Sequence, residues 1–161
     1  MLRALLLGAH LSVLAWALVL SACGGQESSV PGLDSNVVAQ LALVEGRYQW
    51  NAELGRYVFS AKDRLEEVTG SQDAEAALRS LVSCLDDSSS TRSTLDGDPV
   101  AMGVLCYEAL SQLVYYEPMS PDGDIAEQWP GHLTPMATRD EMRAAREAWE
   151  AVVTSGEYIF L

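Results

Sequence analysis

The N-terminal segment of the chain looks like a removable signal, so only the residues after it are expected to form a folded domain. One basic residue, Arg3, precedes an apolar run over residues 4–20, and the small residues Ser21 and Ala22 close that run. This order is typical of an export signal that a peptidase removes. The run of about 17 residues also reaches the lower limit for a membrane-spanning helix, so an uncleaved anchor and an ordinary secretory signal cut near Ala22 stay open as alternatives. We expect residues 1–22 to be absent from the mature protein.

A cysteine directly follows this signal. The run Leu20-Ser21-Ala22-Cys23 resembles the lipobox of bacterial lipoproteins. The resemblance implies that Cys23 receives a diacylglycerol and that the signal is cleaved just before it. The protein would then be attached to the membrane through this lipid anchor. Two or three acyl chains attach a protein far more firmly than one chain, whose binding is reversible. The resemblance also implies the outer membrane, facing the periplasm, because Gly24 stands where lipoproteins retained at the inner membrane carry aspartate.

The charge of the mature chain is strongly acidic. Without Arg3, nine basic residues remain against 23 acidic ones, a formal charge of −14. Such a surface disfavours nucleic acid and anionic lipid as partners. Residues 23–36 are rich in Gly, Ser and Pro and indicate a flexible tether behind the lipid. Residues 37–161 have the length of one ordinary domain.

Apolar residues in this domain recur mostly at helical spacing. Stripes with helix punctuation predict helices over 35–45, 58–69, 74–85, 99–116 and 139–155. Asp98 followed by Pro99 indicates the start of the fourth helix, and Thr138 with Glu141 indicates a capping box for the last. Residues 47–55 indicate a turn or short strand, 86–94 a polar loop, and 118–135 an irregular segment. Because no strand alternation is sustained, we expect an all-α domain, or nearly so, of about five helices.

Part of this pattern resembles a known helical repeat. The segment from Ala77 to Val114 reads ALRSLVSCLDD, a loop, and VAMGVLCYEALSQLV, which looks like a HEAT-type helical pair. It departs from that family in its long loop and in having too few units for a solenoid groove. The resemblance implies binding or scaffolding rather than catalysis.

Two further cysteines, Cys84 and Cys106, lie on the apolar faces of consecutive predicted helices. An even pair in an oxidising envelope favours a disulfide. The alternative is two reduced cysteines that pack as small apolar residues.

Motifs for catalysis and for metal binding are weak. The one mature histidine, His132, has no frame that brings it to a nucleophile. Asp122, Asp124 and Glu127 offer oxygen ligands but do not match a calcium loop. We therefore expect no cofactor and no metal, name no catalytic residue, and keep a hydrolase built on acidic residues only as a less favoured hypothesis.

Aromatic residues suggest a different activity. Flat rings from Tyr115, Tyr116 and Trp129, with Trp50 as a fourth candidate, would form a platform for a glycan or a peptide. The alternative is that these rings cover helix ends. The first hypothesis for function is thus a lipid-anchored envelope protein that binds a protein partner of the envelope or has a structural role. The second is an envelope glycan or small-ligand binder that uses the Trp129 loop.

Overall fold

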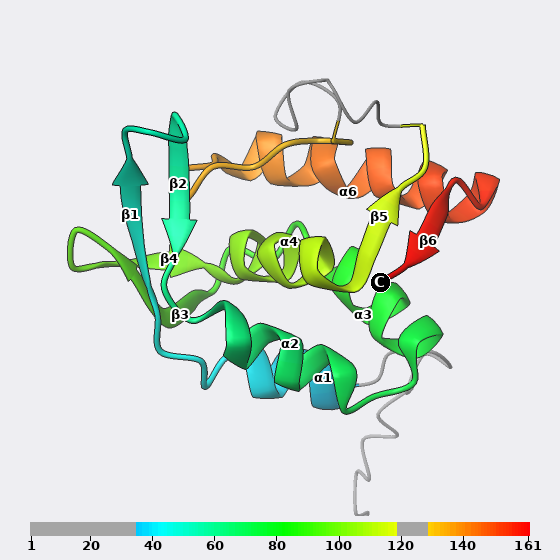
Figure 1. The fold of residues 1–161 in the computed structure, drawn as a ribbon, viewed down its shortest axis with the longest axis horizontal. Helices are drawn as coiled ribbons and strands as arrows, with labels where there is room; N and C mark the ends of the chain where they lie inside the picture. The colour runs from blue at the N-terminus through cyan, green and yellow to red at the C-terminus, as the bar shows by residue number, and fades with distance from the viewer. Residues whose placement is uncertain (1–34, 119–128) are drawn as a thin grey trace, which may run out of the picture.

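The domain is a mixture of helices and strands, so the expectation of an all-α fold is wrong. The computed structural model describes residues 35–118 and 129–161 (Figure 1). In these residues the chain order is α1 (Ser35–Leu41), β1 (Arg47–Asn51), β2 (Arg56–Phe59), α2 (Lys62–Gly70), α3 (Ala74–Cys84), β3 (Ser90–Leu95), β4 (Asp98–Ala101), α4 (Met102–Leu113), β5 (Val114–Tyr116), α6 (Arg139–Ser155) and β6 (Tyr158–Phe160). None of the helices in this part of the chain is long and apolar enough to cross a membrane.

The strands form two sheets. The larger one has the order β2-β1-β3-β4, with β1 antiparallel to β2, parallel to β3, and β3 antiparallel to β4. The smaller one pairs β5 with β6 in antiparallel register, Val114 opposite Phe160 and Tyr116 opposite Tyr158. This second sheet fixes the segment after α6 beside the end of α4.

Strand β3 has polar residues on its inner face, so its sequence lacks the alternation of apolar and polar residues that indicates a strand. Thr91 and Ser93 are both buried. The Ser93 hydroxyl donates to the carbonyl of Val44 at 2.9 Å, and that of Thr91 donates to the carbonyl of Val100 at 3.0 Å. A buried polar side chain that finds such partners is tolerated in a core, but it removes the signal on which the prediction relied.

The hairpin between β3 and β4 also corrects the predicted start of the fourth helix. Asp96 and Gly97 have φ angles of 53° and 97°, the left-handed conformation that tight hairpin turns require. Asp98 and Pro99 therefore belong to β4 rather than to a helix start. The helix begins at Met102 and ends at Leu113, so residues 114–116 form a strand and not its last turn.

The other helix signals give the right elements. Thr138 and Glu141 form the predicted capping box of α6, with both reciprocal hydrogen bonds present. Gly156 ends α6 in the left-handed conformation, at φ 75°. Val58, expected in a helix, lies instead in β2.

Helix α4 is the centre of the domain. It contacts α1, α2, α3, β3, β4 and β5, and Figure 1 shows it between α6 on one side and α1 and α2 on the other. Nine of its twelve residues are buried. The exceptions are Glu108, Ser111 and Gln112, which are half-buried and form one polar stripe of this helix.

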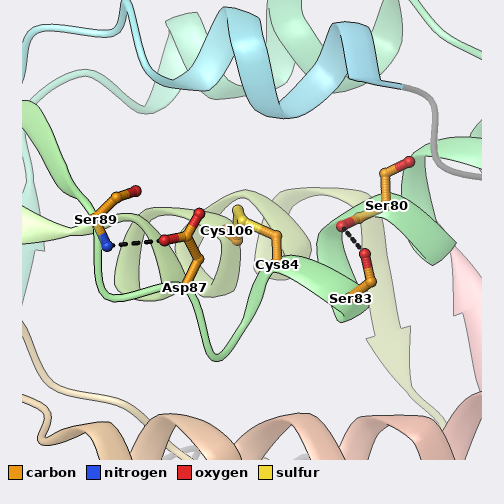
Figure 2. The surroundings of a disulfide bond; sticks show 6 residues. All are labelled: Ser80, Ser83, Cys84, Asp87, Ser89 and Cys106. Atoms are coloured by element: carbon orange, nitrogen blue, oxygen red, sulfur yellow. Dashed lines mark hydrogen bonds between the residues drawn. A yellow bond between two sulfur atoms is a disulfide. The ribbon is translucent and has the colours of Figure 1, made fainter. Parts of the chain in front are cut away.

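A disulfide joins α3 to α4 (Figure 2). The sulfurs of Cys84 and Cys106 are 2.01 Å apart, and their Cα atoms are 6.1 Å apart. Both residues are buried. The chain between them leaves α3, forms the β3–β4 hairpin and returns, and the amide of Gly103 donates to the carbonyl of Asp87 at 2.8 Å. The bond therefore closes a loop that carries half of the larger sheet.

Candidate functional site

A cavity of about 420 Å³ opens above the polar stripe of α4. Its floor is α4, and its walls are the β1–β2 hairpin, β5, the start of α2 and the segment 129–135. Figure 1 shows the hairpin and β5 near opposite ends of α4. The volume lies in the range of sites for small molecules. The residues that line it are Tyr48, Trp50, Gly55, Arg56, Tyr57, Val58, Lys62, Val104, Tyr107, Glu108, Ser111, Gln112, Val114, Tyr115, Trp129, His132, Leu133, Thr134, Pro135 and Leu161.

The floor carries a polar stripe on an otherwise apolar helix. Glu108, Ser111 and Gln112 follow the spacing i, i+3, i+4, which places them on one helix face. All three line the cavity. The remaining nine residues of α4 are buried. The three polar residues therefore present hydrogen-bonding groups to a molecule in the cavity.

Aromatic rings form much of the wall. Trp50, at the end of β1, is 59% exposed and meets Tyr57 edge-on, with ring centroids 5.3 Å apart. Tyr115 faces the same space from β5. Its neighbour Tyr116 does not line the cavity and contacts Trp149 of α6 instead, at 6.5 Å between centroids. Successive residues of a strand point to opposite faces, so the expected platform contains Tyr115 without Tyr116.

Trp129 lies deeper than an exposed platform residue would. It is 7% exposed, and its ring packs against Trp149 at a centroid distance of 5.1 Å. It also lines the cavity. The structure thus brings together Trp50, Tyr115 and Trp129 around one space, from three separate elements.

Two buried polar atoms in the cavity wall lack hydrogen-bond partners among the described residues. They are the hydroxyl of Tyr48, whose residue is 4% exposed, and Nε1 of Trp129. An unsatisfied buried donor costs about 1–3 kcal/mol. Nε1 of Trp149 is also without a partner, but it lies outside the cavity. For Tyr48 and Trp129 the polar atoms are themselves buried, so they lie behind the surface of the cavity.

The charges of the cavity centre on Glu108. Its carboxylate is 3.7 Å from Nζ of Lys62, the first residue of α2. Burial raises the pKa of Glu108, and the nearby cations of Lys62 and Arg56 lower it in part. Burial and the charge of Glu108 raise the pKa of Tyr48 well above its usual value, so this hydroxyl keeps its proton at neutral pH.

The segment 129–135 is held in place at two points. The hydroxyl of Tyr107 lies 3.2 Å from Nδ1 of His132. Gly131 adopts φ 55° and lies directly on Ala145 of α6, where a Cβ would overlap the backbone. A left-handed φ and a close approach both favour glycine. The first contact ties this wall to α4, the floor of the cavity, and the second ties it to α6.

Several residues of this site gave no usable signal in the sequence. Tyr48, Arg56 and Lys62 are far from α4 along the chain and reach the cavity only through the fold. Glu108 is the exception, because a carboxylate and two polar residues in an apolar helix mark a face that is not packed. His132 has a structural partner in Tyr107 and no nucleophile arrangement around it among the lining residues.

The acidic residues of the weak calcium-loop motif, Asp122, Asp124 and Glu127, lie outside the described residues. Within 35–118 and 129–161, no three His, Cys, Asp or Glu residues are grouped so as to hold a metal ion.

Comparisons of the chain with models of protein families, with curated proteins and with solved structures give no match.

Proposed function

We propose that this protein is a lipid-anchored protein of the bacterial envelope whose domain binds a small ligand in the cavity above α4. The lipid anchor rests on the resemblance at Leu20 to Cys23, and Gly24 after it supports the outer membrane as its location. The ligand-binding role, rather than a purely structural one, rests on the cavity. The observation that carries it is a space of about 420 Å³ that aromatic rings line above the polar stripe of Glu108, Ser111 and Gln112.

The composition of the cavity supports ligand binding over catalysis. Sites for small molecules combine apolar and aromatic walls with a few placed polar groups, and Trp50, Tyr57 and Tyr115 around Glu108 have that form. Hydrolysis of a glycosidic bond needs two carboxyl groups on either side of that bond. Glu108 is the one acidic side chain among the lining residues, so the cavity supplies one of the two.

The indole N–H groups of the protein give a direct test. The mature chain, residues 23–161 with Cys23→Ser to leave it without lipid, contains Trp50, Trp129 and Trp149, and each indole gives its own NMR signal. We expect the low-mass fraction that muramidase releases from bacterial envelopes to shift the signals of Trp50 and Trp129 strongly.

Two variants separate cavity binding from other effects. Ser111→Trp fills the cavity from its floor and should abolish the shifts. Leu43→Ala removes an exposed apolar side chain outside the cavity and should leave them unchanged. Equal shifts in the Ser111→Trp variant, or no shift of Trp50 and Trp129 in the folded parent, would contradict the proposed function.

A further inference from the structure

The lining of the cavity is richer in cations and hydrogen-bond donors than the rest of this acidic protein. Lys62 is the one lysine of the chain and Arg56 one of its nine arginines, and both line the cavity against one acidic side chain, Glu108. The mature chain as a whole carries a formal charge of −14. A local excess of positive side chains inside such a protein favours an anionic group at that place.

The charged groups that line the cavity require acceptors and donors in a defined combination. Lys62 and Arg56 only donate. Lys62 is ion-paired with Glu108, and no ion pair of Arg56 occurs among the residues that the structure describes. Glu108 accepts, and its carboxylate forms an ion pair with Lys62 at 3.7 Å. A carboxylate offers about four lone-pair sites, so it has capacity left for a hydroxyl donor.

The aromatic wall adds a third requirement. Trp50 and Tyr57 meet edge-on at the rim, and the Trp50 ring is largely exposed. An exposed indole face offers a large, rigid apolar contact to a flat ring or to the C–H face of a sugar. One molecule that satisfies all three requirements carries an anion, several hydroxyl or acetamido groups, and a ring with an apolar face.

We infer that the cavity binds a sugar acid, with its carboxylate beside Arg56 and Lys62 and its hydroxyl groups toward Glu108. This inference rests on the proposed function and names the class of ligand for the same site. A neutral sugar satisfies Glu108 and the rings but leaves Arg56 without an anion, since Lys62 is already paired with Glu108. An aromatic acid matches the cations and the rings but gives Glu108 no donor.

Two monosaccharides form a matched pair for the test. N-acetylmuramic acid equals N-acetylglucosamine with an added lactyl carboxylate, so the comparison isolates the anion. We expect titrations followed by the Trp50 and Trp129 indole signals to give an affinity for the sugar acid about tenfold higher than for the neutral sugar. This ratio corresponds to about 1.4 kcal/mol in binding free energy. 3-Phenylpropionate, an aromatic acid without hydroxyl groups, should bind more weakly than the sugar acid.

Charge variants locate the anion. Arg56→Gln and Lys62→Gln should each remove most of the preference for the sugar acid and leave binding of the neutral sugar nearly unchanged. Arg47→Gln is the matched control, because Arg47 lies in the same hairpin but does not line the cavity, and it should keep the preference.

The outcomes separate the inference from the function on which it rests. Equal affinity for both sugars, a tighter complex with 3-phenylpropionate, or a preference that survives both Arg56→Gln and Lys62→Gln would overturn the sugar acid and keep ligand binding in the cavity. If neither sugar shifts the indole signals while the muramidase-released fraction does, the inference fails and the proposed function stands. If that fraction also leaves the signals unchanged, both fail.

Discussion

The hydroxyl of Tyr107 in α4 lies 3.2 Å from Nδ1 of His132, which belongs to the segment that forms one wall of the cavity. The two rings meet nearly at right angles, with centroids 6.0 Å apart. Burial raises the pKa of Tyr107 far above its usual value, although a backbone hydrogen bond from Leu133 lowers it in part. The hydroxyl is thus protonated and joins floor to wall through side-chain and backbone contacts.

Tyr107→Phe removes this link without changing the ring. We expect a loss of about 1 kcal/mol in the free energy of unfolding, the usual net worth of one hydrogen bond. Residues 129–135 should also exchange their amide protons faster. A double-mutant cycle with His132→Ala measures the coupling. Additive effects of the two substitutions would show that the pair contributes nothing to stability.

Gly131→Ala tests whether the same wall is fixed by close packing. The substitution adds a Cβ that overlaps the backbone of Ala145 and strains a φ of 55°, and forced contacts of this kind cost about 1–3 kcal/mol. Gly156→Ala is the control, because Gly156 has φ 75° but open space around it. We expect denaturant unfolding to show the larger loss for Gly131→Ala. Equal losses would mean that backbone strain alone accounts for the effect.

The Cys84–Cys106 bond should be a main source of stability. It spans 22 residues, and closing such a loop in the unfolded chain is worth about 3 kcal/mol by the chain-entropy model. We expect the double variant Cys84→Ser/Cys106→Ser to lose about this amount in chemical denaturation, and reduction of the parent to have the same effect. Alkylation of both thiols in the native, unreduced protein would contradict the bond.

The helices were predictable because their apolar residues repeat with the helical period. The stripe through Ala77, Leu81 and Leu85 and the capping residues of α6 act locally, so they can be read without the fold. Apart from residues 47–55, which indicated a turn or short strand and contain β1, the strands were missed for the opposite reason. In β3 the inward residues are Thr91 and Ser93, whose burial depends on carbonyl acceptors from elsewhere in the chain.

The candidate site was predictable only in part. The sequence showed which aromatic residues could contact a ligand, and of these Trp50, Tyr115 and Trp129 do line one cavity. Their meeting depends on pairing of β1 with β2 and of β5 with β6, which no local pattern shows. Tyr116 could not be separated from Tyr115 because residues 114–116 read as the last turn of a helix.

Cys23→Ala tests the proposed anchor. The substitution removes the thiol that would carry the diacylglycerol, so we expect labelling with a palmitate analogue to be lost and the signal to remain uncleaved or the protein to leave the membrane. The parent should fractionate with the outer membrane because Gly24 follows Cys23. Undiminished labelling of the variant would end the lipoprotein proposal, whereas a parent found only in the inner membrane would overturn the sorting alone.

Glu108→Gln should change how stability depends on pH. Burial raises the pKa of the Glu108 carboxyl in the folded protein above the ordinary value of 4.5, with Lys62 and Arg56 opposing the shift. Between these two pKa values the folded chain binds more protons than the unfolded chain, so the contribution of this group to stability falls as the pH rises. Below 4.5 the carboxyl is neutral in both states and costs nothing. The neutral amide of the variant has no such dependence.

We therefore expect the variant to gain stability relative to the parent as the pH rises above 4.5, and the gain to level off once Glu108 is ionised in the folded state. Denaturant unfolding of both proteins over a pH series measures the difference directly, and taking the difference removes the effect of the other acidic residues. Glu67→Gln, on the exposed face of α2, is a control that shows the effect of the same substitution at an exposed position. A difference that is constant with pH, or that falls above 4.5, would mean that Glu108 is not held in an environment that disfavours its charge.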